Sequence, residues 1–283
     1  CIVPRARGSQ RSRLIDAIVN EVRILYHLGY REVVLTGVQI GAYGSDWDPA
    51  RRRVARGRGP TLTDLVARLL AETPMPRLRI SSIQPQDWPA GFLELWQDAR
   101  MCRHLHLPLQ SGSDSVLKRM VRRYRTADFR ALVERLRARI PEVAITADVM
   151  VGFPGETDRE HAASVAFVRE LAFAEQHIFR YSSRPGTAAA RLPDDVPPEV
   201  KKQRSAELHA LDRELRTAYR SRFLGRTMEV LWEEAIEEEG STVWSGLTDN
   251  YLRVFAHGDA LEGMLTPVRL DALTEDGIRG RIA

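Results

Sequence analysis

His104-Leu-His-Leu-Pro-Leu-Gln110, with Ser-Gly-Ser-Asp114 directly after it, carries the clearest structural pattern in this chain. Leu105, Leu107 and Leu109 recur with the two-residue period of a strand, and the run from Ser115 to Met120 has a helical pattern. The pattern therefore predicts a strand, then a small polar loop, then the N-terminus of a helix. The free N–H groups and the glycine of such a junction can hold a carboxylate or a ribose. Because serine and aspartate also cap helices, the pattern alone fits a plain connection equally well.

The same strand-and-helix unit recurs along the first two thirds of the chain. Helices are expected at Ser12 to Leu28, Thr61 to Leu70, Thr126 to Arg139 and Thr157 to Ala172. Strands are expected at Glu32 to Thr36, Leu78 to Ile83, around Leu105, at Ala144 to Val151 and at Gln176 to Tyr181. Such alternation predicts an α/β fold in which a parallel sheet has outer helices, as an open sheet or a partial barrel.

Nearly every predicted strand ends in a small or polar segment. These segments are Thr36-Gly37, Ser81-Ser82, Gln110-Ser111-Gly112-Ser113, Gly152-Phe153-Pro154-Gly155-Glu156 and Tyr181-Ser182-Ser183. Parallel α/β sheets and barrels bind their ligands at the carboxyl ends of the strands. Any one segment could be an ordinary loop, but five together favour a ligand site at this edge.

The sequence changes character after Gly186. Leu192 to Pro198 contains three prolines, and a long helix is expected from Glu199 to about Phe223. Five short strands then follow, at Met228 to Trp232, Thr242 to Ser245, Tyr251 to Phe255, Met264 to Leu270 and Ile278 to Ile282. This pattern predicts a small closed or half-closed β-barrel, and we place the domain boundary between residues 221 and 222.

Composition and charge narrow the class of protein. The chain has 283 residues, no long apolar run of the kind that spans a membrane, and only two cysteines, which excludes a disulfide framework and suggests a cytoplasmic protein. Residues 222–283 contain 6 Arg and Lys and 12 Asp and Glu, a net charge of −6, so the total of +4 leaves about +10 on residues 1–221. The basic surface therefore belongs to the larger part.

Several motifs together resemble the radical S-adenosylmethionine (SAM) methylthiotransferases. They are Cys1-Ile-Val-Pro-Arg-Ala-Arg-Gly8, Leu35-Thr-Gly-Val-Gln-Ile-Gly-Ala-Tyr-Gly44, His104 to Asp114, Asp148-Val-Met-Val-Gly-Phe-Pro-Gly-Glu-Thr157 and Tyr181-Ser-Ser-Arg-Pro-Gly-Thr187. The first two motifs resemble the branch that acts on N6-threonylcarbamoyladenosine of tRNA. The terminal barrel resembles the TRAM domain of the same family, so the resemblance covers essentially the whole chain.

This resemblance implies a fold and a chemistry. The fold is a partial (β/α)6 TIM-like barrel followed by a TRAM barrel. The implied reaction places a methylthio group at position 2 of the modified adenosine next to the anticodon, through a radical generated from SAM at a 4Fe-4S cluster. The sulfur comes from an auxiliary 4Fe-4S cluster in an amino-terminal domain, and the electron comes from a donor such as flavodoxin or ferredoxin. No membrane partner is implied.

The sequence departs from the family at the cluster. The family holds its cluster with a Cys-x3-Cys-x2-Cys loop, and only its third cysteine is present, as Cys1. One thiolate cannot hold such a cluster. We therefore expect a fragment of a longer enzyme that is itself inactive, with Cys1 as the metal ligand and Cys102 as a structural residue.

The resemblance also assigns residues to the SAM site. Gly37 and Val38 are expected to face the methionine moiety, with Ser82 nearby. Gln110, Ser111, Gly112 and Ser113 are expected to take the ribose or the carboxylate, while Asp148 and Gly152 line the far wall. Asp148 could equally be a buried acid that is satisfied by backbone donors. His104 and His106 are expected to be packed and hydrogen-bonded, and no general base is assigned.

Clustered cations suggest contact with RNA phosphates. The candidates are Lys118, Arg119, Arg122, Arg123 and Arg125 beside the central loop, and Arg5, Arg7, Arg11 and Arg13 near the start. A solvated charged face is the alternative interpretation. The terminal barrel is acidic, with Glu237-Glu238-Glu239, so any RNA contact there is expected through Arg226, Arg253, Arg269 or the aromatics Trp244 and Tyr251.

Two other functions remain open. A sibling enzyme that modifies an aspartate of a ribosomal protein has the same barrel and differs in its TRAM surface. The missing cysteines would also suit a non-catalytic RNA-binding module, which would bind tRNA without iron.

Overall fold

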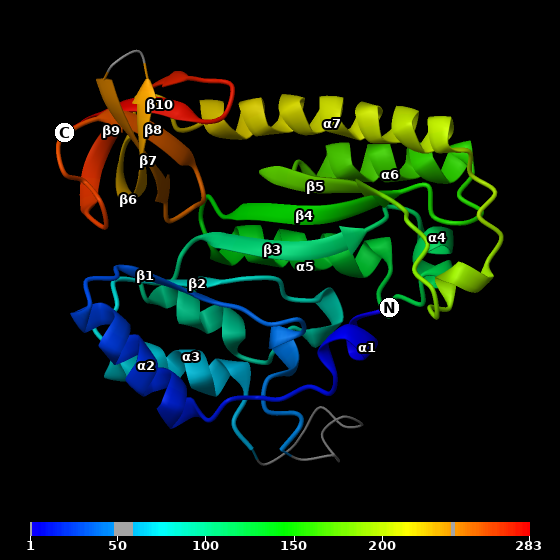
Figure 1. The fold of residues 1–283 in the computed structure, drawn as a ribbon, viewed down its shortest axis with the longest axis horizontal. Coiled ribbons are helices and arrows are strands. Elements are labelled where there is room, and N and C mark those ends of the chain that lie inside the picture. The colour runs from blue at the N-terminus through cyan, green and yellow to red at the C-terminus, as the bar shows by residue number, and fades with distance from the viewer. Residues whose placement is uncertain (1, 48–58, 239–240) are drawn as a thin grey trace.

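Five parallel strands form the central wall of the molecule (Figure 1). The computed structural model describes residues 2–47, 59–238 and 241–283. Two of the strands, β1 (Glu32–Leu35) and β2 (Arg77–Ile80), pair in parallel, and β3 (His104–Gln110), β4 (Ala144–Val151) and β5 (Glu175–Arg180) form a second parallel group. Single parallel bridges, Leu78 to Met101 and Ser82 to His106, join β2 to the β3 region. The predicted α/β architecture is confirmed; the (β/α)6 barrel that the resemblance implies has one strand more than these five.

The helices follow the predicted alternation. Their bounds are α1 (Val3–Arg7), α2 (Ile15–His27), α3 (Leu62–Glu72), α4 (Asp114–Arg119), α5 (Thr126–Arg139), α6 (Asp158–Leu171) and α7 (Pro198–Ser221). Short 3₁₀ turns, η1 (Ile40–Ala42), η3 (Pro85–Asp87), η4 (Phe92–Gln97) and η5 (Ala189–Arg191), lie in the connections. The capping boxes of Thr61 with Asp64 and of Thr157 with Glu160 are both present, because each side chain satisfies a free N–H of the first turn.

One helix start differs from the sequence-based expectation. The helix expected from Ser12 to Leu28 begins at Ile15 and ends at His27, and the flanking Leu14 and Leu28 are 69% and 70% exposed. Ser12 instead donates hydrogen bonds from its backbone N–H and its hydroxyl to the Asp46 carboxylate, so this residue belongs to a loop and not to the helix. The helix expected at Thr126 to Arg139 is confirmed as α5, and the backbone N–H of Thr126 donates to Asp114.

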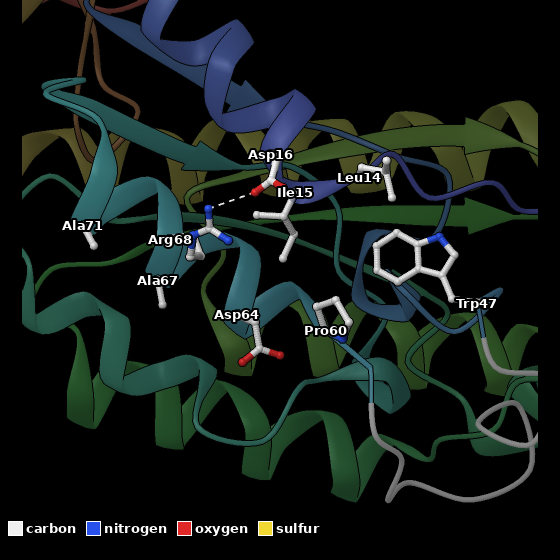
Figure 2. A pocket seen from close by; sticks show the side chains of 9 residues that line it. All are labelled: Leu14, Ile15, Asp16, Trp47, Pro60, Asp64, Ala67, Arg68 and Ala71. Carbon is white, nitrogen blue, oxygen red and sulfur yellow. Dashed lines mark hydrogen bonds and ion pairs between the residues drawn. The ribbon is translucent and has the colours of Figure 1, made fainter.

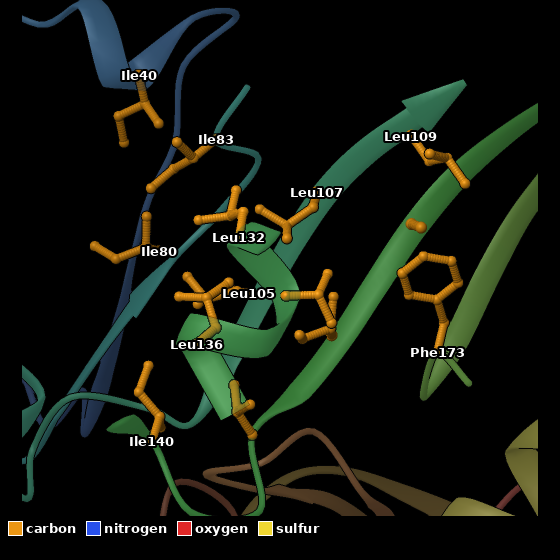
Figure 3. Close-up of a cluster of buried hydrophobic side chains, with 14 of the residues drawn as sticks. Ile40, Ile80, Ile83, Leu105, Leu107, Leu109, Leu132, Leu136, Ile140 and Phe173 are labelled. Carbon is orange, nitrogen blue, oxygen red and sulfur yellow. The ribbon is translucent and has the colours of Figure 1, made fainter. Parts of the chain in front are cut away.

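The main core lies between the strands and the outer helices (Figure 3). Leu105, Leu107 and Leu109 of β3 are fully buried and point to the same side as Leu132 and Leu136 of α5. Since side chains alternate across a strand, the residues between these leucines face the opposite side of the wall. The period-two pattern of the sequence thus separates a hydrophobic face from a polar one.

The C-terminal segment forms a closed five-stranded barrel in the order β10-β8-β7-β6-β9. Its strands are β6 (Thr227–Glu238), β7 (Ser241–Thr248), β8 (Arg253–His257), β9 (Leu265–Leu273) and β10 (Ile278–Ile282). All five predicted strands are confirmed. Strand β6 extends beyond Trp232, where it was expected to end, because a register shift between Trp232 and Glu234 lets it continue pairing with β7.

The barrel packs against the amino-terminal ends of the parallel strands. Arg77, the first residue of β2, donates to the carbonyls of Leu247 and Glu229 at 2.9 and 2.8 Å. At the start of β3, the ring of His104 stacks on that of Tyr251 with centroids 4.0 Å apart. The barrel therefore covers the edge of the sheet opposite to the carboxyl ends where ligands are expected.

The longest helix, α7, links the two parts and runs alongside α6 and β5 (Figure 1). Asp212 of α7 accepts a hydrogen bond from the backbone N–H of Gln176 in β5 at 2.8 Å. No helix among the described residues is both long and apolar enough to cross a membrane. The helix ends at Ser221 and the barrel begins at Thr227; the exact domain boundary stays a prediction.

Candidate functional site at the carboxyl ends of the strands

The parallel order brings the predicted loops to one edge of the sheet. Gly37, Ser82, Gln110 and Gly152 follow or end four neighbouring strands, β1 to β4. The short helix α1 lies at this edge as well (Figure 1), and Arg5 borders a pocket of about 570 Å³ with the loop residues that follow β5. The topology thus gathers the sequence-predicted segments where an α/β sheet binds ligands.

The turn after β1 presents an open apolar side chain. Val38 is 60% exposed, and a side chain added at Gly37 would meet nothing closer than Ile40, at 3.7 Å. Gly41 in the same turn packs against Asp87, whose carbonyl oxygen would lie 2.5 Å from an added Cβ. The turn is therefore anchored at Gly41 and open at Gly37 and Val38, which suits the predicted contact with a ligand.

The loop of Gln110 to Ser113 is docked on α6. The Ser111 hydroxyl lies 3.1 Å from the Ser164 hydroxyl, which also accepts from the Gly112 N–H at 3.0 Å. A Cβ at Gly112 would lie 2.7 Å from Phe167 Cβ and 2.8 Å from Ser164 Cα. The close approach of α6 is therefore by itself a reason for a glycine at this position. The four predicted binding residues of this loop remain predictions.

Gln110 has an unusual backbone for its side chain. Its φ is +67°, a region that costs free energy for residues with a Cβ, and the residue is buried. Strain of this kind is often retained where a side chain or backbone group must be held at a site. This places Gln110 foremost among the loop residues as a candidate ligand contact.

Asp148 lies between two histidines on the face of the wall opposite the leucines of β3. Its Oδ1 lies 3.3 Å from Nε2 of His106 and 3.5 Å from Nδ1 of His177. Burial raises the pKa of the Asp148 carboxyl, but hydrogen bonding with both imidazoles outweighs it and holds that pKa well below its usual range. The alternative of an acid satisfied by backbone donors is therefore wrong, because imidazoles satisfy it.

The two histidines of β3 are packed and hydrogen-bonded, as the sequence suggested. Nε2 of His104 and Nδ1 of His106 both lie 3.0 Å from the hydroxyl of Thr146. Burial lowers the pKa of His104 well below its usual value, so this ring is neutral. His177, the third imidazole of this face, was not singled out by the sequence reasoning; it lies outside the quoted motifs, and only its pairing opposite Asp148 reveals it.

Gly152 is held by the chain's own side chains. Its N–H donates to the carboxylate of Glu156, and Cγ of Lys201 would lie 2.3 Å from a Cβ at this position, where φ is +70°. Glu156 is itself buried beside Arg204, and burial raises the pKa of its carboxyl. Sequence reasoning missed Lys201 and Arg204, because they come from α7, nearly 50 residues away.

The cysteines do not supply a cluster within this chain. Cys1, the predicted metal ligand, lies outside the described residues. Cys102 is 1% exposed at the amino-terminal end of β3, its Sγ lies 3.7 Å from Glu32, and burial raises the pKa of its thiol. Its structural role is confirmed. The residues of this chain thus do not by themselves fit a 4Fe-4S cluster, which requires several thiolates.

Most of the predicted phosphate contacts are free to act. Lys118, Arg123 and Arg125 are exposed and Arg122 is half-buried, and none makes a side-chain ion pair within the described ranges. Arg119 differs because its guanidinium binds both carboxylate oxygens of Glu160 at 2.8 and 2.9 Å. Arg5 and Arg7 are exposed at the same edge of the sheet.

The aromatic contacts expected on the barrel are wrong. Trp244 is 8% exposed and its Nε1 donates to the carbonyl of Gly258 at 3.0 Å, while Tyr251 is sandwiched between His104 and the guanidinium of Arg79. Neither ring is free to stack on a base. Arg226 binds Glu142, Arg253 binds Glu233 and Arg269 lies near Asp271, so these cations are already paired; Glu239 lies outside the described residues.

A second pocket lies away from this edge, between α2 and α3 (Figure 2). Its volume is about 810 Å³, and Figure 2 shows Leu14, Trp47 and Pro60 at one end and the Asp16–Arg68 ion pair, 3.0 Å long, at the other. It belongs to the outer helix layer and carries none of the predicted site residues. We assign no function to it.

The ion pair beside the central loop makes stability depend on pH. The bond from Arg119 lowers the pKa of Glu160 to about 2, from 4.5. A carboxyl whose pKa is lower when folded stabilises the fold above its unfolded pKa, and this contribution is lost as pH falls from about 4.5 toward 2. We expect Glu160→Gln to destabilise the protein at pH 7 and to differ progressively less from the parent below pH 4.5, measured by urea unfolding at each pH. A constant difference would contradict this assignment.

Comparison with known proteins agrees with the motifs. The model of the radical SAM superfamily matches residues 1–168. The chain is 37% identical, over 95% of its length, to the threonylcarbamoyladenosine tRNA methylthiotransferase MtaB of Bacillus subtilis. It is 34% identical, over its whole length, to the tRNA-2-methylthio-N(6)-dimethylallyladenosine synthase of Acetivibrio thermocellus. It spans 58% and 57% of the lengths of these two proteins.

Among solved structures, the fold is similar to that of coproporphyrinogen III oxidase (HemN) from Escherichia coli, a radical SAM enzyme. The TM-score is 0.51 at 16% identity, over 83% of this chain and 59% of that one. At this identity the likeness concerns the fold alone.

Proposed function

Because this chain belongs to the radical SAM superfamily, we propose that it forms the catalytic barrel and RNA-facing part of a tRNA methylthiotransferase. The reaction we propose adds a methylthio group at position 2 of N6-threonylcarbamoyladenosine next to the anticodon. The observation that carries this proposal is the 37% identity to an enzyme named for that substrate, over 95% of the chain.

The family implies a 4Fe-4S cluster and SAM. The cluster supplies one-electron reductive cleavage of SAM, but this chain provides only Cys1 toward it, so no step is assigned to the residues described. For SAM we propose the strand-end residues Gly37, Val38, Ser82 and Gln110 to Ser113, with Asp148 and Gly152 beyond them. An auxiliary cluster, an electron donor such as flavodoxin or ferredoxin, and a cytoplasmic location complete the proposal.

A second substrate has a specific observation in its favour. The dimethylallyladenosine enzymes match at 34% identity over the whole chain, only slightly below the first relative. Both substrates are adenosines with a substituent on N6, and they differ in that threonylcarbamoyl carries a carboxylate and dimethylallyl does not. The cationic residues at the carboxyl edge favour the anionic substituent.

Nucleoside analysis of tRNA tests the proposal. We expect that deleting the gene that encodes this chain removes 2-methylthio-N6-threonylcarbamoyladenosine from total tRNA and leaves N6-threonylcarbamoyladenosine in its place, measured by mass spectrometry. Restoring the gene is the control. Loss of the dimethylallyl product would favour the second substrate, and an unchanged nucleoside profile would overturn both.

The free cations of the segment that follows the central loop should bind RNA phosphates. We expect the triple variant Lys118→Gln, Arg122→Gln, Arg123→Gln to bind a tRNA anticodon stem-loop more weakly by at least tenfold at low salt, and to lower the slope of log K against log salt by up to about 3. Binding is measured by fluorescence anisotropy over a salt series.

The matched control changes cations that are already occupied. Arg130 binds Glu170 on α6, and Arg169 binds Glu214. The double variant Arg130→Gln, Arg169→Gln should leave the salt slope nearly unchanged. Equal losses in the two variants would mean that the RNA responds only to net charge, and the assigned contact would be wrong.

A further inference from the structure

Three ligand-type side chains converge on one face of the parallel wall, opposite the leucines of β3. His106, Asp148 and His177 come from the adjacent strands β3, β4 and β5. Asp148 is paired opposite His177, and His106 is paired opposite Thr146, two residues before Asp148 on the same face of β4. The backbone register therefore sets the three side chains beside one another, and a hydrogen-bonded sheet holds them there.

The two separations that involve Asp148 are those of donor atoms that share one ion. One nitrogen or oxygen from each of these residues lies within 4.8 Å of the others, and Oδ1 of Asp148 is 3.3 and 3.5 Å from the two imidazole nitrogens. Two donors that bind one zinc ion at about 2.1 Å, with an angle of about 100°, lie about 3.2 Å apart. A good N–H···O hydrogen bond is shorter, about 2.9 Å.

We propose that His106, Asp148 and His177 bind a divalent transition-metal ion of the Zn²⁺ class. Two imidazoles and one carboxylate form a donor set that suits such ions and leaves coordination positions open. His177 is 58% exposed and Asp148 26% exposed on their side chains, so the open positions face solvent. The site has no thiolate and is therefore distinct from an iron-sulfur cluster.

A second layer of contacts orients one ligand. Nδ1 of His106 lies 3.0 Å from the Thr146 hydroxyl, which fixes the ring and leaves Nε2 toward Asp148. The ring of His106 also stacks on His177, with centroids 5.3 Å apart. Metal-binding histidines commonly use their second nitrogen in this way, and losing such a contact lowers metal affinity by about 10- to 100-fold.

Metal titration of the 283-residue chain tests the site. Co²⁺ serves as the spectroscopic probe and Zn²⁺ as its competitor, with calorimetry for stoichiometry. We expect one equivalent to bind without the intense absorption of a thiolate ligand. Asp148→Asn and His177→Ala should each weaken binding by about 100-fold, and Thr146→Val by about tenfold.

Two controls separate this site from others. His257→Gln removes an exposed histidine of the barrel, and Cys1→Ser removes the thiolate; both should leave the affinity unchanged. Circular dichroism checks that each variant is folded, and His177, being exposed, is the ligand whose loss should least disturb the fold. No binding by the parent chain, or unchanged affinity in both His177→Ala and Asp148→Asn, overturns the proposal.

Discussion

Replacing Arg79 by methionine is expected to lower the free energy of unfolding by about 3–5 kcal/mol. Arg79 is 3% exposed, and its guanidinium binds both carboxylate oxygens of Glu32 at 2.6 and 3.0 Å. It also donates to the carbonyls of Thr248 and Asp249 and lies over the ring of Tyr251. Methionine fills the space but leaves two barrel carbonyls without this partner, and it leaves the Glu32 carboxylate, 11% exposed, with only the longer contact to Arg77 at 3.9 Å. Urea unfolding measures the loss.

A double variant shows whether the cost comes from the Glu32 carboxylate that loses its main partner. Glu32→Met combined with Arg79→Met removes both charges and should recover part of the loss, because burying apolar groups costs less than burying a carboxylate that has lost its main partner. Arg281→Ala is the surface control: that side chain is 77% exposed and pairs with Asp271, so we expect less than about 1 kcal/mol. If the double variant is less stable than Arg79→Met, the loss of this partner by Glu32 is not the main cost.

Local sequence patterns predicted the helices and strands because the interactions that form them join residues that are close in sequence. The leucines of β3 alternate with the period of a strand, and each capping box joins residues only three apart. The attachment of the barrel could not be predicted in the same way. Arg77 and Arg79 alternate with leucine and isoleucine, a pattern typical of a strand with one solvent-exposed polar face. All four residues are nevertheless buried. The reason is that backbone carbonyls about 170 residues away accept hydrogen bonds from the two arginines.

The candidate site likewise combines features that the local sequence predicts with contacts that depend on residues distant in sequence. The sequence located the loops at the carboxyl ends, since order along the chain fixes the parallel topology. The sequence could not show which polar groups are already bonded within the protein. The Ser164 hydroxyl of α6 is hydrogen-bonded to Ser111 and Gly112, and His177 is paired with Asp148. Such partners become known only when strands and helices that are distant in sequence are packed together. A loop can therefore offer a ligand only those polar groups that are not already bonded within the protein.

Gly112→Ala is expected to destabilise the protein by about 1–3 kcal/mol, the usual cost of overpacking a close contact. The new Cβ would lie 2.7 Å from Phe167 Cβ and 2.8 Å from Ser164 Cα, and neither atom can rotate away, so α6 must shift. That shift also strains the hydrogen bonds of Ser164 to Ser111 and Gly112. Urea unfolding at neutral pH measures the change.

Gly37→Ala is the matched control at the same edge of the sheet. Its Cβ would have no neighbour closer than 3.7 Å and its φ is not in the left-handed region, so alanine should change stability by less than about 1 kcal/mol in either direction. The two variants thus distinguish two reasons for a glycine. A helix fills the space beside Gly112, whereas the space beside Gly37 stays open toward the predicted ligand. Equal stability of both variants would contradict the docking of the loop on α6 and restore ligand approach as the reason for Gly112.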